Sequence, residues 1–243
     1  MKSVEITLPV LNEEACLEKS VKQVIQFLDV HSLSNWSLVI ADNGSTDQTL
    51  DLAKKLECEF PDRIRVISIR IQGVGAAVRV AWTSSKASIV GYMDIDLATS
   101  LSHLIDVKEM FSNGQEIKIV NGSRHLPKSI VENQKWVRSI TSRSLNTLLY
   151  VVLGVRFTDA MCGFKFFDRE AVLVLLQETP QIPDWFICAE LLIRAEWKCF
   201  NINEIPIVWR HDSGSRVKIF KLSYQYSKHI LRLFVEKKNS YRL

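Results

Sequence analysis

The chain has 243 residues, of which 47% are hydrophobic and 24% charged, with nine glycines and six prolines. This composition excludes a disordered, collagen-like or low-complexity protein and is typical of a globular domain with a sizeable core. The five cysteines include no Cys-x-x-Cys pair, so we expect reduced thiols and neither a disulfide framework nor a zinc site. The most apolar stretch, residues 148–155, is far shorter than the ~20 residues of a membrane-spanning helix, so we expect no such helix.

Positive charge gathers at the C-terminal end. The whole sequence has 31 Lys/Arg and 27 Asp/Glu, a net charge of +4, yet residues 210–243 alone carry nine basic and two acidic residues. A basic end of this kind predicts an anionic partner, either nucleic acid or an anionic lipid surface. Nucleic acid is disfavoured, because the basic residues match no recognised nucleic-acid-binding module and the rest of the chain is slightly acidic.

The first half of the sequence alternates short β-branched runs with helical patterns. Strands are predicted over residues 4–10, 38–42, 64–68, 89–94 and 117–122. Helices are predicted between them over residues 13–30, 47–56, 76–85 and 101–111. This alternation indicates an α/β fold, with a mostly parallel, Rossmann-like sheet sandwiched by helices. Such a sheet binds ligands at the carboxyl ends of its strands.

The second half is less regular. Residues 124–143 hold five basic residues against one acid and are interpreted as a basic mobile loop, with a helix predicted over 136–153. Two more strands and a helix between them are predicted over residues 164–167, 202–209 and 185–198. Residues 217–238 have the pattern of an amphipathic helix. We predict one catalytic domain over residues 1–216 and a basic amphipathic tail over 217–243.

The sharpest local signal is Asp94-Ile95-Asp96, which follows a predicted strand. Two carboxylates at positions i and i+2 of a turn suit a hard divalent cation. A cation held there can neutralise a diphosphate leaving group. The same pair also describes a turn with two solvated acids, so its context decides between the two interpretations.

That context consists of two motifs at the ends of earlier predicted strands. They are Pro9-Val10-Leu11-Asn12-Glu13 and Asp42-Asn43-Gly44-Ser45-Thr46-Asp47. In this order and spacing the three motifs resemble glycosyltransferase family 2, which has a GT-A fold. The resemblance implies a metal site at Asp94 and Asp96, occupied by Mg²⁺ or Mn²⁺. It also implies a nucleotide-sugar site formed by Pro9, Val10, Asn12, Glu13, Asp42, Gly73, Asp94, Ile95 and Asp96. Many members have a second Asp where this chain has Asn43.

The segment Gly73-Val74-Gly75 superficially matches a dinucleotide-binding motif. We reject that interpretation, because the segment follows the third predicted strand and lacks the third glycine. A tight turn and helix start close to the donor diphosphate is the interpretation that we prefer. The family has a similar Gly-x-Gly-x-Ala segment at this place.

Three further motifs narrow the resemblance to the polyprenyl-phosphate sugar synthases, the dolichyl-phosphate mannose and glucose synthase group. They are Asn121-Gly122-Ser123-Arg124, a Thr158-Asp159-x-x-Cys162-Gly163-Phe164-Lys165 signature closer to glucose-type members, and an Asp184-Trp185-Phe186 segment followed by Glu190. The resemblance implies an acceptor-phosphate site formed by Arg124, Arg138, Ser142, Arg210 and Arg216. It implies catalytic roles for Asp96, Arg124, Asp159 and Glu190.

Each of these residues also has a structural interpretation. Arg124 and Arg138 would otherwise be solvated loop charges. Asp159 would otherwise cap a turn, and Glu190 would otherwise be a buried ion-pair partner on its helix. The motif pattern favours function for the arginines and leaves both alternatives open for the two acids.

A lipid phosphate is the acceptor that this residue set favours. A phosphate monoester has its second pKa near ~6 and is already an anionic nucleophile at pH 7, so it needs no strong base. It needs arginines to hold it and a metal to stabilise the departing diphosphate. We therefore predict inverting hexose transfer from a nucleoside-diphosphate sugar to a polyprenyl phosphate, undecaprenyl or dolichyl, at the cytoplasmic membrane face. The signature favours UDP-glucose over GDP-mannose.

The tail suggests where the acceptor is met. Its basic stripe, interpreted as a contact with an anionic membrane surface, comprises Lys218, Lys221, Gln225, Lys228 and Arg232. The alternative is a helix packed on the domain with a solvated basic edge. The resemblance also implies a separate small, multispanning, flippase-like membrane protein as partner. Two rival functions remain: a transferase for hydroxyl acceptors with Asp159 or Glu190 as base, and a non-catalytic membrane-binding relative.

Overall fold

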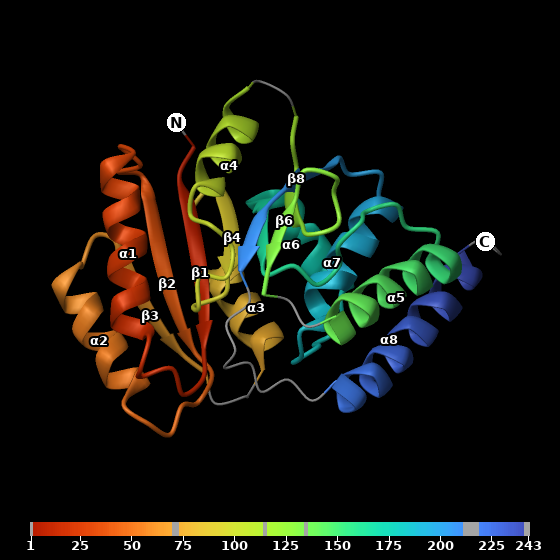
Figure 1. Cartoon of the computed structure of the whole chain (residues 1–243), viewed down its shortest axis with the longest axis horizontal. Helices are drawn as coiled ribbons and strands as arrows, with labels where there is room; N and C mark the ends of the chain where they lie inside the picture. Colours follow the sequence, from red (N-terminus) through yellow and green to blue (C-terminus); the bar gives the residue numbers. More distant parts are fainter. Residues whose placement is uncertain (1, 70–72, 114–115, 134–135, 211–218, 241–243) are drawn as a thin grey trace.

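A computed structural model describes residues 2–69, 73–113, 116–133, 136–210 and 219–240 (Figure 1). For residues 137–138, 219–224 and 240 the description covers the backbone alone. Within the described parts of the chain, none of the helices combines the length and the hydropathy that a membrane crossing requires. All five cysteines are free, as expected.

A seven-stranded mixed sheet forms the centre of the molecule. Its strands are β1 (Val4–Val10), β2 (Trp36–Asp42), β3 (Ile64–Ser68), β4 (Ile89–Met93), β5 (Ile119–Ser123), β7 (Phe164–Asp168) and β8 (Ile202–Pro206). They follow the order β3-β2-β1-β4-β7-β5-β8. β1 to β4 run parallel, β7 is antiparallel to both β4 and β5, and β8 is parallel to β5. The predicted mostly parallel α/β sheet is therefore confirmed.

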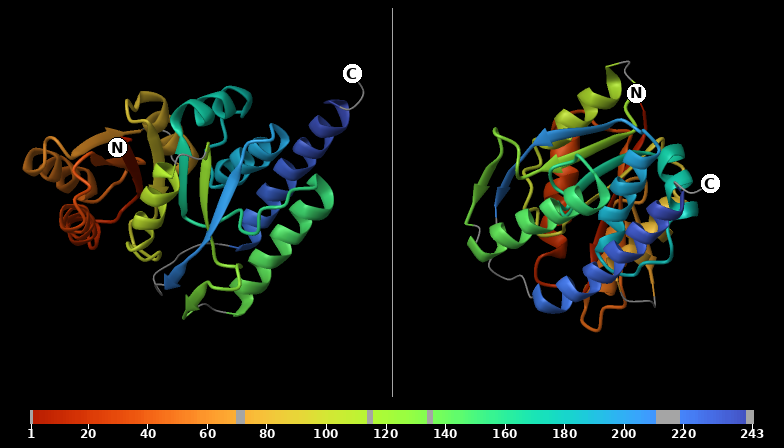
Figure 2. Two further views of the ribbon diagram at one scale, coloured as in Figure 1. Left: turned by 90° about the horizontal axis from the view of Figure 1, so that it is seen from above. Right: turned by 90° about the vertical axis from the view of Figure 1, so that its right-hand side faces the viewer.

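Helices cover both faces of this sheet (Figures 1 and 2). They are α1 (Leu17–Val30), α2 (Thr49–Glu59), α3 (Val74–Ser84), α4 (His103–Ser112), α5 (Trp136–Leu153), α6 (Arg169–Glu178), α7 (Phe186–Trp197) and α8 (Ile219–Ser240). α1, α2 and α4 pack on one face through a first apolar cluster, and α3 with α5 to α8 packs on the other through a second. The result is a three-layer sandwich.

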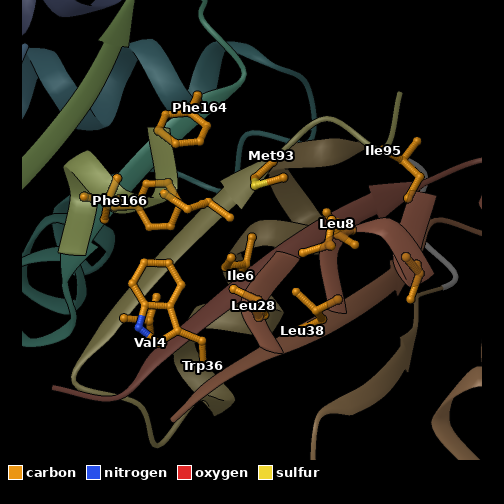
Figure 3. Close-up of a cluster of buried hydrophobic side chains, with 14 of the residues drawn as sticks. Val4, Ile6, Leu8, Leu28, Trp36, Leu38, Met93, Ile95, Phe164 and Phe166 are labelled. Atoms are coloured by element: carbon orange, nitrogen blue, oxygen red, sulfur yellow. The ribbon is translucent and has the colours of Figure 1, made fainter. Parts of the chain in front are cut away.

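β1 shows why the central strands form. All seven of its residues are buried, because helices cover it on both sides, and such a strand is apolar almost throughout. Ile6 and Leu8 point into the first cluster, together with Leu28 of α1 and Leu38 of β2 (Figure 3). The apolar side chains of α1 recur at helical spacing on one face, as the sequence predicted.

Two predictions for the second half were wrong. The strand expected over 202–209 is broken: β8 ends at Pro206, and β9 (Val208–Arg210) pairs in a separate two-stranded sheet with β6 (Ile130–Glu132). Residues 124–143 are consequently not one loop, because they contain β6 and the first two turns of α5. α6 was missed altogether, although Asp168 caps it by accepting a hydrogen bond from the Ala171 backbone N–H at 3.2 Å.

The C-terminal helix α8 packs on the domain. Tyr226, Ile230 and Leu233 are buried in the second cluster. Arg232 of the predicted basic stripe does not face outward: it forms ion pairs with Glu190 of α7 and with Glu236. Lys228 is exposed, whereas Lys218 and the side chain of Lys221 lie outside the described residues. The boundary at 216 and 217 also falls outside them and stays a prediction.

Candidate functional site

The site lies where the strand order reverses. From β1 the chain moves outward to β2 and β3, and then returns to β4 on the other side of β1. In sheets of this kind the crevice at the reversal, beyond the carboxyl ends of the strands, binds the ligand. Val10 and Asp42 end β1 and β2 side by side, and Asp94 follows the end of β4. Three of the predicted motifs therefore meet at one edge.

Hydrogen bonds join the loop after β1 to the loop after β2. The Asn12 side-chain oxygen accepts from the Thr46 backbone N–H at 2.8 Å, and the Asn12 N–H donates to Ser45 Oγ at 3.0 Å. The Glu13 N–H donates to Thr49 Oγ1 at 2.8 Å. Asn12 adopts a φ of 57°, a left-handed conformation that asparagine tolerates better than most residues. Hydrogen bonds thus hold the two predicted nucleotide-binding segments together as one unit.

The end of β2 is rich in hydrogen-bond acceptors. Asp42 is buried, and its carboxylate accepts from the backbone N–H groups of Gly44 and Ser45, each at 3.2 Å. Asn43 is also buried, and its side-chain oxygen has no hydrogen-bond partner among the residues described. A buried acceptor without a protein partner is uncommon, and a bound water or a ligand would supply the missing donor. By contrast Pro9 and Val10 are buried within β1. They would contribute to ligand binding by their position at the end of the strand and not through exposed side chains.

Asp94 and Asp96 are fixed by their neighbours. Met93 and Ile95 anchor both flanks of Asp94 in the first cluster (Figure 3), so Ile95 can meet a ligand only through its backbone. Asp94 is half-buried and Asp96 is exposed, and Asp96 Oδ1 accepts from the Ala98 N–H at 3.0 Å. The structure thus directs the second carboxylate of the pair to the surface at the switch point.

Gly163 belongs to the Thr158–Lys165 signature and lies directly against Asp94. A Cβ atom at Gly163 would stand 1.9 Å from Asp94 Oδ2, which no side chain can do. Glycine therefore permits the close approach of the two segments, and a larger residue would displace the Asp94 carboxylate. This contact joins the signature to the Asp94–Asp96 turn, although the two are far apart in the sequence.

The two carboxylates fit a hard divalent cation by their chemistry. No group of three or more His, Cys, Asp or Glu side chains with metal-site geometry occurs among the described residues. A cation here would therefore take two carboxylates from the protein and its other oxygens from a diphosphate and water. Mg²⁺ is commonly bound in this way, through one or two carboxylates plus substrate phosphates.

Arg124 and Asp159 form a buried, two-pronged ion pair. Arg124 Nε donates to Asp159 Oδ2 at 2.7 Å, and Nη2 donates to Oδ1 at 2.9 Å. Burial works to raise the pKa of Asp159, but the charge and hydrogen bonds of Arg124 outweigh it and lower the pKa to about 2. Burial works to lower the pKa of Arg124, but Asp159 chiefly, and Asp94 to a lesser extent, raise it. Arg124 is thus no solvated loop charge, and Asp159 stays ionised at neutral pH.

A buried polar network supports this pair. Lys165 is fully buried, and its Nζ donates to Asn121 Oδ1 at 2.6 Å and to the Cys162 carbonyl at 2.9 Å. The Asn121 amide in turn donates to the Asp159 carbonyl at 3.0 Å and to Glu204 Oε1 at 2.9 Å. The network therefore holds the chain on both sides of the segment 160–161. Burial raises the pKa of Cys162 to about 12, so its thiol is a packing group and no nucleophile.

This network is what the sequence motifs did not disclose. Asn121 and Lys165 stand in motifs, but nothing assigned them a role, and Glu204 was not singled out. A lysine within the aromatic run 164–167 is the signal that could have found it, since a buried ammonium needs partners. Glu204, which also accepts from the Thr158 N–H at 2.8 Å, gives no comparable signal because its partners are distant in the sequence.

The other predicted acceptor residues are dispersed. Ser142 of α5 lies 3.1 Å from His125 Nε2, and His125 follows Arg124, so Ser142 belongs to the same wall of the site. Arg210 is largely exposed and donates to Glu132 Oε2 at 2.7 Å, across the β6–β9 sheet. The Arg138 side chain and Arg216 lie outside the described residues. Trp209, next to Arg210, is stacked under Arg124, with 5.4 Å between the guanidinium carbon and the ring centre.

Glu190 takes part in a different cluster. It is fully buried on α7, where Oε1 accepts from Arg194 Nε at 2.9 Å and Oε2 accepts from Arg232 of α8. Arg194 also contacts Glu236 at 2.9 Å. These are the contacts of a buried ion-pair partner that joins two helices, the structural alternative for this residue. Its catalytic role has no support in this geometry.

The glycine turn at the start of α3 is needed for close packing. A Cβ at Gly73, whose φ is 137°, would stand 2.0 Å from the Pro183 carbonyl oxygen. A Cβ at Gly75 would stand 2.1 Å from the Ile182 carbonyl, and the Gly75 N–H donates to Pro183 at 2.9 Å. The turn is thus seated on the segment before α7. Its closeness to a donor diphosphate stays a prediction.

The fold defines a class of protein: a doubly wound α/β protein, in which the ends of β1, β2 and β4 are the expected place of a ligand. The sequence matches the family model described as Glycosyl transferase family 2 over residues 5–175. The chain therefore belongs to glycosyltransferase family 2, as its motifs predicted.

Several curated proteins are similar to this chain. Glycosyltransferase AglD of Haloferax volcanii is 30% identical over 231 residues, which cover 94% of this chain and 36% of AglD. The dolichyl-phosphate beta-glucosyltransferase of Homo sapiens is 26% identical over 241 residues, which cover 95% of this chain and 74% of that protein. The corresponding protein of Saccharomyces cerevisiae is 28% identical, with coverages of 94% and 73%. The chain thus spans about a third of AglD and about three quarters of the other two.

A solved structure supports the fold. Glucosyl-3-phosphoglycerate synthase from Mycobacterium tuberculosis, in complex with Mn²⁺ and UDP-glucose, has a TM-score of 0.66 to this chain at 20% identity. The match covers 96% of this chain and 79% of the other. The GT-A fold expected from the motifs is therefore confirmed.

Proposed function

We propose that this glycosyltransferase moves a hexose from a nucleoside-diphosphate sugar to a polyprenyl phosphate, with inversion at the anomeric carbon. The observation that carries the proposal is the closeness of two opposite charges. Asp94 contributes to raising the pKa of Arg124, and Gly163, which stands in the same signature as Asp159, lies against Asp94. A carboxylate pair suited to a donor-bound cation thus stands beside an arginine suited to an anionic acceptor.

On the donor side, Asn12, Glu13 and Asp42 in the hydrogen-bonded loops after β1 and β2 would hold the base and ribose. The carboxylate of Asp42 and the partnerless amide oxygen of Asn43 are acceptors that match an N–H of a nucleobase. A UDP-glucose-type donor is favoured over GDP-mannose. The names of the relatives, dolichyl-phosphate beta-glucosyltransferases, and the UDP-glucose complex of the structural neighbour support this choice.

Asp94 and Asp96 would hold Mg²⁺ or Mn²⁺. When bound, the cation supplies positive charge that stabilises the departing diphosphate. The protein's own contribution is orientation: the Ala98 N–H holds one oxygen of Asp96, and the Met93 and Ile95 side chains fix the turn in the core. The Mn²⁺ complex of the structural neighbour supports this assignment.

On the acceptor side, Arg124 would hold the lipid phosphate. Its pair with Asp159 uses Nε and one N–H of Nη2, so that other N–H donors of the five remain for a phosphate. Asp159 orients this guanidinium and, with a pKa of about 2, is a weak base at pH 7. A hydroxyl acceptor would need a stronger base to take its proton, whereas a phosphate acceptor is already anionic at pH 7 and needs none. Ser142, Arg138, Arg210 and Arg216 would complete the phosphate site.

The acceptor also implies a location. A polyprenyl phosphate resides in a membrane, so the protein would act at the cytoplasmic membrane face. A small, multispanning, flippase-like membrane protein is the partner that we propose there.

The test is an acceptor comparison. The purified protein is incubated with radiolabelled UDP-glucose, Mn²⁺, and either a short-chain polyprenyl phosphate or the corresponding polyprenol. We expect chromatography to detect a polyprenyl glucosyl phosphate in the reaction with the polyprenyl phosphate and no product in the reaction with the polyprenol. Product from the polyprenol at an equal rate would overturn the phosphate-acceptor proposal, and donor binding without transfer to any acceptor would favour the non-catalytic relative.

A further inference from the structure

The helix α8 has two apolar faces. Its inner face carries Tyr226, Ile230 and Leu233, all buried in the second cluster. Its outer face carries Leu231 and Val235, with 63% and 49% of their surface exposed, and Phe234 beside them. A helix that only packs on a domain presents polar residues to solvent. The outer apolar face of α8 is therefore not explained by packing.

The neighbouring helix α5 has the same property. Trp136, Ile140 and Val151 recur at multiples of helical turns and are 74%, 54% and 72% exposed. α5 and α8 lie side by side (Figures 1 and 2), and Lys237 Nζ of α8 donates to the Leu153 carbonyl of α5 at 2.6 Å. The described residues include thirteen exposed large hydrophobic side chains, and eight of them are on these two helices. Such concentration marks an interaction surface, whereas scattered single residues do not.

The charge around this surface is basic. α5 contains no acidic residue, and Arg143 on it is exposed. On α8 the exposed Lys228 and Lys238 flank the apolar residues along the helix. The one acid of α8, Glu236, is engaged inward with Arg194 and Arg232. A basic rim complements anionic lipid headgroups, and it would repel the identical rim of a second copy in a symmetric dimer.

We propose that the outer faces of α5 and α8 form one surface that binds an anionic lipid bilayer. It comprises Trp136, Ile140, Arg143, Leu148, Tyr150, Val151, Lys228, Leu231, Phe234, Val235 and Lys238. The apolar side chains enter the headgroup region and the basic ones meet lipid phosphates, as in interfacial helices. Of the basic stripe expected from the sequence, this surface includes Lys228, whereas Arg232 is paired with Glu190 and Glu236.

The inference rests on the proposed function, because a lipid acceptor is what would require the protein to bind a bilayer. The opposite side of α5 closes the candidate site, through Ser142 beside His125 and through Asn146, whose side-chain oxygen accepts from the Ala160 N–H at 3.0 Å. One helix therefore separates the bilayer from the residues that would hold the acceptor phosphate. A lipid acceptor has only to pass the width of this helix to reach Arg124.

The test measures vesicle binding without any substrate. The full chain is floated with vesicles of phosphatidylcholine, with and without phosphatidylglycerol. The double variant Val151→Gln, Leu231→Gln changes one outer residue on each helix, and Val30→Gln is the matched control. Val30 is 72% exposed, as Val151 is, but lies on α1 at the other end of the molecule (Figure 1). We expect binding that requires phosphatidylglycerol, an about tenfold loss in the double variant, and no loss in the control.

Three outcomes would overturn the proposal. The first is a wild-type chain that does not float with anionic vesicles, and the second is an equal loss in Val30→Gln and the double variant. The third is a wild-type dimer, seen by light scattering, that the double variant dissociates, since the surface would then join two copies. Transfer to a water-soluble short-chain acceptor is measured separately. Its failure would overturn the proposed function and leave the vesicle result standing, and matching thermal unfolding curves verify that the variants are folded.

Discussion

The two halves of the molecule differ in where their charged side chains lie. In the first half, β1 to β4 with their helices, the site carboxylates follow strand ends, and Asp96 is exposed. In the second half the charged groups of the motifs are buried and satisfy one another, as Arg124 does with Asp159 and Lys165 with Asn121. Polar groups turned toward a ligand contribute to function, whereas buried pairs also contribute to the stability of the fold. Substitutions in the two halves should therefore separate activity from stability.

The largest effect is expected in the second half, from Asp159→Asn. The change removes one partner of a buried ion pair and leaves the Arg124 guanidinium, only 8% exposed, without its counter-charge. Breaking such a pair costs about 3–5 kcal/mol. Urea unfolding should show this loss as a lower midpoint. A stability equal to that of the wild type would mean that the buried pair is not a structural element, and the contrast between the halves would be lost.

Acid provides the control for this prediction. The pKa of Asp159 is about 2 in the folded protein, below the ~3.9 of an unfolded chain. A group with a depressed pKa stabilises the fold above its unfolded pKa, and the contribution is lost as the pH falls through its folded pKa. The difference in unfolding free energy between wild type and Asp159→Asn should therefore shrink between about pH 4 and pH 2. A difference that stays constant would assign the effect to packing rather than charge.

In the first half the corresponding change is Asp96→Ala. The residue is exposed, so its removal should leave the unfolding midpoint unchanged. Turnover should fall at least ~100-fold, as expected for the loss of one strong electrostatic contact in the transition state, about 2.7 kcal/mol. EDTA should abolish the activity of the wild type, and Mn²⁺ should restore it. The exposed acid Asp62, in the turn between α2 and β3, serves as the matched control, and Asp62→Ala should keep full activity.

Much of the fold could be predicted because its signals are local. The predicted bounds of β1, β3 and α5 agree with the structure. The pair β6–β9 could not be predicted in the same way. Each of its strands has three residues, and the pairing joins residues 78 positions apart, such as Glu132 and Arg210. Such short strands exist only because of their partner, and no local pattern encodes them.

The same difference between local and distant signals holds for the residues of the candidate site. Asp94 and Asp96 are visible in the sequence because two carboxylates in one turn are a compact signal. For Glu190 the sequence shows one opposite charge, Arg194 four residues on along the same helix, but not the second partner Arg232, which lies on a helix that the sequence presents as a basic tail. The motif alone is compatible with a catalytic and with a structural role for Glu190, and its contact with Arg232, 42 positions away, joins two helices that no local pattern relates.

The smallest effect concerns Lys165, where the two halves meet. Lys165→Met keeps the length of the side chain but removes the ammonium, which leaves Asn121 Oδ1 and the Cys162 carbonyl without that donor. Leaving a buried acceptor unsatisfied costs about 1–3 kcal/mol, so the unfolding midpoint should fall by less than in Asp159→Asn. The Cys162 carbonyl also accepts from the Tyr92 hydroxyl at 3.0 Å, which retains part of the geometry.

The same substitution should also affect activity. Because Cys162 precedes Gly163, the contact of Gly163 with Asp94 should loosen, and kcat should fall more than nucleotide affinity measured by calorimetry. Lys165→Arg retains a donor and should recover part of the loss. If Lys165→Met lowered stability with kcat unchanged, the buried lysine would support the sheet alone, and the two halves would be coupled by Gly163 without it.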